Sequence, residues 1–221
     1  MARVPNPVRI TWLLLLLCYG AFWLWYGGSG EPLAPEEIED FVSRFRESPI
    51  GVRDPELAER VRRFAEADDG RELIIVNLVK MRERRPRSER GDFGLGASVA
   101  DPAAGVRMLR KLVSLAGHPV ASAEVAESFL QFEGAPTWSH IALVRYRSRR
   151  DFLEATSSPE FLEHATRNGA AFRNTIKLAA VLRMSFFAGP RAVLLAVLVG
   201  IGAVVHAGLR RREAMRNQAG T

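Results

Sequence analysis

Residues 73–81 read LIIVNLVKM, and this stretch decides the fold of the central part of the chain. It is a nearly continuous apolar run, rich in β-branched residues and preceded by Gly70. A run of this length is too short for a helix of its own and is typical of a central strand. Asn77 is the one uncharged polar residue in it. A buried amide needs hydrogen-bond partners, so Asn77 requires an explanation.

The segments after this strand alternate between helical and extended patterns. Asp101-Pro102 begins a helix that Gly117 ends, with Val106, Leu109, Leu112, Val113 and Ala116 expected on one side. Residues 120–132 and 138–147 alternate apolar and polar side chains and predict a hairpin, with helical segments at 149–156 and 160–172 and a last strand at 174–184. The order strand, helix, strand, strand, helix, strand predicts an α+β, ferredoxin-like βαββαβ domain over residues 70–185.

Both faces of the predicted strands carry apolar residues, which bears on the oligomeric state. In a four-stranded sheet of this kind the helices cover one face and leave the other bare. Apolar residues on the bare face predict that something covers it, and a second sheet from an identical subunit is the usual solution. We therefore expect a homodimer.

Residues 31–69 precede the sheet and predict a helical lead-in. The first expected helix follows Pro35 and places Ile38, Phe41, Val42 and Phe45 on one face. The second follows Asp54-Pro55 and aligns Leu57, Val61 and Phe64. These apolar stripes indicate that both helices pack on a core.

The two ends of the chain are apolar. Residues 10–26 and 192–209 contain no Asp, Glu, Lys or Arg, and with their flanks they predict transmembrane helices at 10–28 and 188–209. Basic residues outside both spans, in segments 1–9 and 210–221, predict cytoplasmic termini and an extracytoplasmic central domain in a cell membrane. Membrane lipid is then a partner.

A cleaved signal peptide is the alternative for the first span, because Arg3 and Arg9 form a basic region before it. The span is longer than a usual signal-peptide core, residues 22–26 form an aromatic belt, and no Ala-x-Ala follows. These features favour a retained anchor. Cys18 is the only cysteine in the chain, so the central domain contains no disulfide.

Small residues recur along the second span and suggest a packing face. They are Ala192, Ala196, Gly200, Ala203 and Ala207, which fall on one narrow stripe of a helix. Such stripes allow close approach of helices in lipid. The first helix or a second copy of the chain is the expected partner, while the plainer interpretation is that Ala and Gly are common in membrane helices.

The charge distribution argues against nucleic acid as a partner. The formal net charge is +6. The ends of the chain and Arg191 carry all of it, so residues 31–190 are neutral. A neutral domain lacks the basic surface that dominates affinity for nucleic acids. We therefore expect no nucleic-acid binding.

The central domain resembles a known family. The resemblance covers residues 71–184 and is carried by Val76–Arg82, Gly117–Val120, Trp138-x-His140, Val144–Ser148, Phe152-Leu153, Ser158–Phe161 and Asn174-Thr175. These segments are similar to the landmarks of a bacterial family of domains of unknown function in the dimeric α/β-barrel superfamily. Arg147 departs from the family pattern, which usually has proline there, and the apolar helices depart from its soluble members. The resemblance implies a ferredoxin-like fold and a dimer; the superfamily also includes cofactor-free and haem-degrading monooxygenases and muconolactone-type isomerases.

Four residues are candidates for a ligand site: Asn77, Trp138, His140 and Tyr146. The last three share one face of their strand by its two-residue period and can line a pocket beside Asn77. Asn77, Trp138 and His140 are the catalytic candidates, because related monooxygenases use residues of these types. The structural alternative is that Asn77 sets strand register, Trp138 packs at the end of the sheet and His140 meets solvent or the dimer interface.

The residues predict no metal site and identify no cofactor. Glu160, Glu163 and His164 share a helix face, but the second histidine of the zinc-protease helix motifs is absent. The leading hypothesis is a membrane-anchored ligand-binding or interaction module with a small hydrophobic ligand. The alternatives are a small monooxygenase or isomerase acting on a hydrophobic substrate, and a scaffold of a membrane complex.

Overall fold

The computed structural model describes residues 7–28, 30–81, 102–127, 137–159, 161–162, 172–182 and 188–218. The chain divides into two compact units. The larger unit comprises residues 27–182, and the smaller unit combines the two ends of the chain, residues 1–26 and 183–221.

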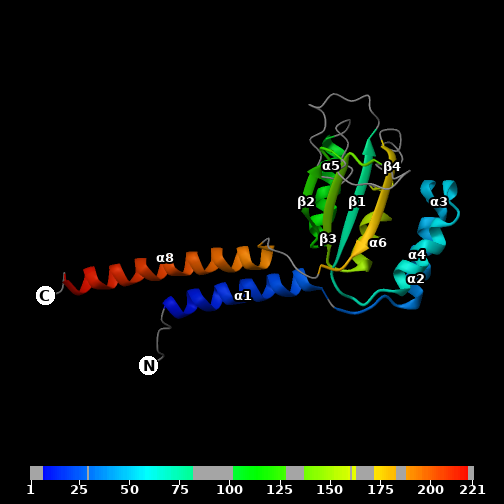
Figure 1. Ribbon diagram of the computed structural model, residues 1–221. Helices are drawn as coiled ribbons and strands as arrows, with labels where there is room; N and C mark the ends of the chain where they lie inside the picture. The colour runs from blue at the N-terminus through cyan, green and yellow to red at the C-terminus, as the bar shows by residue number, and fades with distance from the viewer. Residues whose placement is uncertain are drawn as a thin grey trace. The chain divides into compact units, whose positions relative to one another are not determined.

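The larger unit contains a four-stranded antiparallel sheet (Figure 1). Its strands are β1 (Leu73–Met81), β2 (His118–Glu124), β3 (His140–Tyr146) and β4 (Phe172–Ala180), in the order β2-β3-β1-β4. This order, with every neighbouring pair antiparallel, confirms the predicted ferredoxin-like arrangement. The bounds of β1 agree with the prediction, whereas β2 and β4 begin two residues earlier than expected and end sooner.

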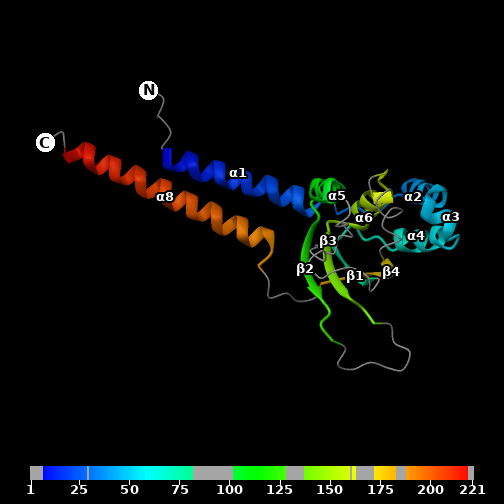
Figure 2. The same cartoon turned by 90° about the horizontal axis from the view of Figure 1, so that it is seen from above.

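Two helices cover one face of this sheet. They are α5 (Pro102–Ser114) and α6 (Arg149–Thr156), which lie on the same side of the strands (Figure 2). The core beneath them consists of Leu73, Ile75, Leu112, Val144, Tyr146 and Ala155. This face is buried because alternate residues of β1 and β3 point toward the helices.

Helix α5 differs from the prediction in which apolar residues it buries. Leu112 and Ala116 are buried as expected, but Val106, Leu109 and Val113 are exposed. Met108 and Leu115 pack on the core in their place. The sequence of α5 is apolar over more than one stripe, so periodicity alone did not identify the inner face.

The lead-in forms three helices, α2 (Pro35–Glu47), α3 (Pro49–Arg53) and α4 (Leu57–Glu66). The predicted apolar stripes are confirmed: their buried members join Leu153 of α6 in a second core cluster of Leu33, Phe41, Val42, Phe45, Ala58, Val61, Ala65 and Leu153. Helix α3 was not predicted. Ser48 begins it by accepting a hydrogen bond from the Gly51 backbone N–H at 3.1 Å. The lead-in is therefore part of the same folded unit as the sheet.

The face of the sheet opposite the helices is apolar and open. Ile176 and Leu178 of β4 are 40% and 49% exposed. Val76 and Leu78 lie beside them on β1 through the pairs Val76–Leu178 and Leu78–Ile176. We call Val76, Leu78, Ile141, Leu143, Ile176 and Leu178 the open face.

The smaller unit contains helices α1 (Pro7–Gly27) and α8 (Pro190–Gln218). Residues 7–27 and 190–212 are each long and apolar enough to cross a membrane, by length and composition. The two helices are in contact at Gly202. The Trp12 ring lies so close to this glycine that a Cβ atom added to it would be 2.5 Å from the ring. Gly202 is not in the predicted small-residue stripe, whose Gly200 has no atom near it. Contact with α1 therefore uses a different face of α8.

Candidate functional site

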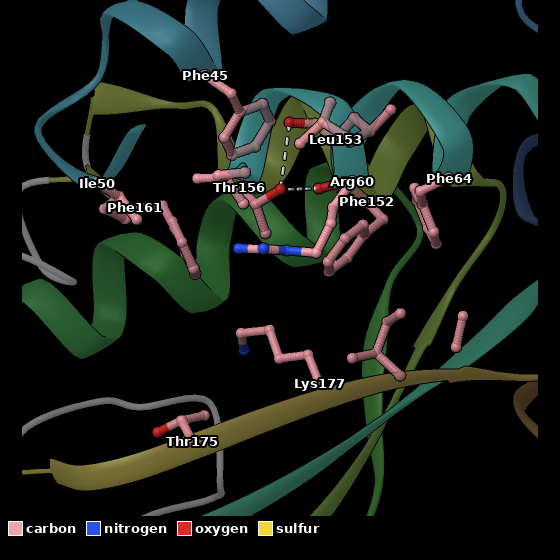
Figure 3. Close-up of a pocket in the computed structure, with 14 residues that line it drawn as sticks. Phe45, Ile50, Arg60, Phe64, Phe152, Leu153, Thr156, Phe161, Thr175 and Lys177 are labelled. Atoms are coloured by element: carbon pink, nitrogen blue, oxygen red, sulfur yellow. Dashed lines mark hydrogen bonds between the residues drawn. The ribbon is translucent and has the colours of Figure 1, made fainter. Parts of the chain in front are cut away.

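A cavity of about 470 Å³ lies between the lead-in helices, α6 and the sheet (Figure 3). Most of its wall is apolar, and four phenylalanines contribute to it. The lining residues are Phe45, Ile50, Leu57, Arg60, Val61, Phe64, Ile75, Phe152, Leu153, Thr156, Phe161, Thr175, Lys177 and Ala179. This volume falls in the range of small-molecule sites, which are mostly apolar with a few polar groups.

Lys177 is the basic group that the sheet contributes to this wall. Because β4 alternates, Thr175, Lys177 and Ala179 face the cavity while Ile176 and Leu178 face the opposite side. The Lys177 side chain extends from the strand toward the space beneath Phe152 and Phe161 (Figure 3). Its Nζ lies 5.8 Å from the Phe161 ring centroid, a distance at which a cation and an aromatic face attract.

Asn77 is the hydrogen-bond partner of the Lys177 amine. Lys177 Nζ donates to Asn77 Oδ1 at 2.6 Å, and β1 pairs the two residues directly. The Asn77 Nδ2 donates to the carbonyls of Ile75 and Ala142, each at 3.3 Å. Because the amide nitrogen meets two carbonyls, the amide oxygen must face the lysine. Asn77 is therefore a fixed acceptor for the amine.

The surroundings of Lys177 favour its neutral form. Lys177 is exposed by its accessible surface, which opens to the cavity, while many protein atoms lie near its amine. Removal from bulk water lowers the pKa of Lys177 to about 8. Among the described residues, no carboxylate lies within ion-pair distance of its Nζ to oppose this change.

Arg60 is the second basic residue in the wall, and its charge is already compensated. Its guanidinium pairs with Asp54 and with Glu56, the latter at 3.4 Å. Its side chain is 45% exposed, so these pairs are worth little to stability. Lys177 is thus the cationic group left for a ligand in the described part of the wall.

His140, a predicted site residue, lies on the same sheet face as Asn77. The two are diagonal neighbours, since Asn77 pairs with Ala142 and His140 with Val79. His140 is buried and shares a hydrogen bond with Ser122 Oγ at 2.9 Å. Burial lowers its pKa, and the nearby charge of Glu124 partly offsets that shift. His140 is therefore held by the sheet and does not line the cavity.

Tyr146 and Trp138 occupy opposite ends of β3. Tyr146 pairs with Leu73 and packs edge-on against Phe152, with ring centroids 5.1 Å apart. Burial raises the pKa of its phenol. Trp138 is half-buried just before the strand. Six residue steps along the strand, about 20 Å, separate His140 from Tyr146. Asn77, His140 and Tyr146 therefore share a face of the sheet without forming one cluster.

The described part of the chain contains no group of three or more potential metal ligands. The triad considered from sequence, Glu160, Glu163 and His164, lies outside the described side chains. The structure thus leaves that motif untested.

Sequence reasoning did not identify Lys177 or the phenylalanines of the cavity. A lysine in an alternating strand is normally solvent-exposed, so its position carried no signal. One signal was present in the composition: the chain contains only three lysines, Lys80, Lys111 and Lys177, against 28 arginines. The phenylalanines came from four separate elements, which only the tertiary structure brings together.

No protein-family model and no curated protein matches this chain. Among solved structures, a protein of unknown function from Rhodopseudomonas palustris is similar, with 19% identity and a TM-score of 0.45 over 57% of this chain and 94% of that one. The hydroxynitrile lyase of Passiflora edulis has 12% identity and a TM-score of 0.37, covering 53% and 99%. SnoaB, a cofactor-independent oxygenase from Streptomyces nogalater, has 17% identity and a TM-score of 0.32, covering 52% and 96%. All three TM-scores are below 0.5, so the fold assignment rests on this chain's own strand order and pairing.

Proposed function

We propose that this chain is a membrane-anchored, dimeric α/β-barrel protein that binds a small hydrophobic ligand in the cavity above β1 and β4. The observation that carries the proposal is an apolar cavity of about 470 Å³ with a single uncompensated amine in its described wall. An apolar body buried against the phenylalanines contributes roughly 25 cal/mol per Å². A polar group at Lys177 orients the ligand.

Native mass spectrometry of the full-length protein, released from mild detergent, tests this proposal. We expect a reproducible added mass that corresponds to a small apolar molecule. Ala179→Trp places a large side chain in the cavity wall and should abolish the added mass. Val52→Trp is the matched control, because Val52 is 73% exposed and does not line the cavity. Equal retention of the ligand by both variants would contradict the proposed site.

The dimer in this proposal is supported by the open face. Exposed apolar side chains on a sheet favour a partner, and a second copy presents a complementary sheet. Leu178→Glu places a charge on the open face, whereas Val52→Glu places one on an exposed part of α3. We expect light scattering to show a dimer for the wild type and Val52→Glu and a monomer for Leu178→Glu. A wild-type monomer would overturn the dimer.

Membrane anchoring with an extracytoplasmic central domain is supported by the two apolar helices and the basic residues outside them. Arg191 stacks on Trp23 and Tyr26 at 4.3 and 4.9 Å, so aromatic rings compensate its charge at the end of α8. Val52→Cys in a Cys18→Ser background should react with a membrane-impermeant maleimide on intact cells. Reaction only after lysis would place the domain inside.

An enzyme is the second candidate, as a small monooxygenase or isomerase using Asn77, Trp138 and His140. The observation that favours it is Asn77, which contacts a cavity residue directly. Substitution of each residue by alanine should then abolish turnover of a cavity ligand while the added mass persists. Unchanged turnover in all three variants would remove this candidate.

A further inference from the structure

The chain uses arginine almost everywhere that it needs a cation, which makes its three lysines informative. There are 28 arginines and three lysines. Arginine stays protonated in proteins, whereas lysine loses its proton readily when it is buried. An amine in the cavity therefore supplies chemistry that the arginines of the chain lack.

The three lysines have different surroundings. Lys111 Nζ forms an ion pair with Glu154 at 3.2 Å. Lys80 Nζ donates to the hydroxyl of Thr137 at 2.9 Å in an exposed position. Lys177 alone meets a neutral amide and aromatic rings inside an apolar cavity.

The contacts of Lys177 can be satisfied by a neutral amine. An ammonium has three N–H donors, and Asn77 Oδ1 is the acceptor that the described residues provide. A neutral amine satisfies that acceptor with one N–H and keeps a lone pair for another atom. With a pKa of about 8, roughly a fifth of the amine is neutral near pH 7.4, against about one part in a thousand for a lysine in water.

We propose that Lys177 is a nucleophile that captures aliphatic aldehydes and ketones in the cavity as imines. This inference rests on the proposed ligand cavity and specifies the class of ligand: a carbonyl group attached to an apolar chain. The chain contacts the phenylalanine walls, while the carbonyl carbon meets the Lys177 Nζ.

The reaction balances without a cofactor. The Nζ lone pair forms a C–N bond to the carbonyl carbon, and the carbonyl π electrons move to oxygen. The two amine protons and that oxygen leave as one water, so the product is a C=N bond and nothing is oxidised or reduced. An apolar wall favours the product because it disfavours the water that reverses the step. Asn77 acts as a positioning residue, since its oxygen sets the direction of the amine.

Reductive trapping tests this inference on the full-length protein in mild detergent. The protein is incubated with octanal and sodium cyanoborohydride, and peptide mapping by mass spectrometry locates the added octyl group. We expect modification at Lys177 to exceed that at Lys80 and Lys111 at least tenfold at pH 7.5. The rate at Lys177 should rise with pH and level off above about 8, because only the neutral amine attacks.

Two variants provide controls. Lys177→Arg retains the charge and lacks the nucleophile, so the octyl group should be lost, whereas Lys111→Arg should leave trapping at Lys177 unchanged. Octanamide, which does not form imines under these conditions, measures reversible occupancy of the cavity by native mass spectrometry. Octanamide must bind both the wild type and Lys177→Arg, which shows that the variant is folded.

The outcomes separate the two proposals. Preferential trapping at Lys177 supports the inference. Octanamide binding with equal trapping at all three lysines overturns the imine and leaves the ligand cavity standing. Loss of octanamide binding in the wild type overturns both.

Discussion

Consecutive residues of β4 point to opposite faces of the sheet, and the two faces carry different kinds of side chain. Thr175, Lys177 and Ala179 line a cavity roofed by helices, while Ile176 and Leu178 lie on an apolar open face. The polar residues Thr175 and Lys177 are thus on the cavity face, and the large apolar residues Ile176 and Leu178 are on the open one. In a sheet that is complete as a monomer, the reverse is normal. The difference fits the two proposals made above, a ligand in the cavity and a second copy of the chain on the open face.

The largest difference is expected in the free energy of unfolding when one leucine on each side of the sheet is replaced by alanine. Leu153→Ala, in α6 on the helix side of the sheet, removes a side chain that is 1% exposed and should reduce the free energy of unfolding by about 2–5 kcal/mol. Leu178→Ala should change it by less than about 0.5 kcal/mol in the monomer. Urea unfolding in mild detergent measures both.

Protein concentration sharpens this first comparison. If the open face pairs with a second copy, the cost of Leu178→Ala should grow with protein concentration, because association stabilises the folded state by mass action. The cost of Leu153→Ala should not grow with protein concentration. If the cost of Leu178→Ala did not change with protein concentration, this result would argue against the paired sheet.

Asn77→Ala should have the next largest effect. It removes the donor to two backbone carbonyls and the acceptor of Lys177, so we expect a loss of about 1–3 kcal/mol. Thr137→Ala removes an exposed hydroxyl contact to Lys80 and serves as the control, with a change below about 0.5 kcal/mol. Chemical denaturation of the two variants side by side decides whether the covered face depends on this amide.

The pH dependence of stability should report the lowered pKa of the Lys177 amine. Folding lowers the pKa of Lys177 from 10.5 to about 8, so between these values the unfolded chain binds more protons and stability rises with pH. Because Lys177 retains accessible surface, we expect a gain of about 1 kcal/mol, well below the full shift. Lys177→Met should remove this rise and Lys111→Met should keep it. A wild-type curve that is flat from pH 8 to pH 10.5 would contradict the lowered pKa of Lys177.

The smallest expected effect concerns His140. Burial lowers its pKa below 6.5, so the stability that the neutral ring provides is present above pH 6.5 and declines as pH falls below it. His140→Gln should weaken the decline between pH 7 and pH 5. Ser122→Ala, which removes the hydrogen-bond partner of the ring, should cost about 0.5–1 kcal/mol at pH 7. Thermal unfolding at the two pH values measures these differences.

The sequence predicted the parts of the molecule that depend on local pattern. The strand at residues 73–81 and the order of strands and helices follow from periodicity and turn residues, and the structure agrees on both. Asn77 stood out because a polar residue in an apolar run must find partners, and it has three. The exposed side of α5 was not predictable, because its apolar residues exceed one stripe.

The cavity itself required the tertiary structure. Phe45, Phe64, Phe152 and Phe161 come from different parts of the chain, and each is explained equally well by an ordinary core. Lys177 resembles a surface lysine until β4 pairs with β1 and places it opposite Asn77. Pairing register and helix packing are long-range, and a shift of one residue would move Lys177 to the other face.

The sequence by itself thus determined the α+β class, the order of the elements and the two apolar terminal segments, because these depend on neighbours along the chain. Only the tertiary structure decided which face of β4 meets the helices, which amine is partly desolvated and which apolar residues remain exposed. The physical reason is that desolvation and cavity shape depend on atoms distant in sequence, and no local pattern records their distances.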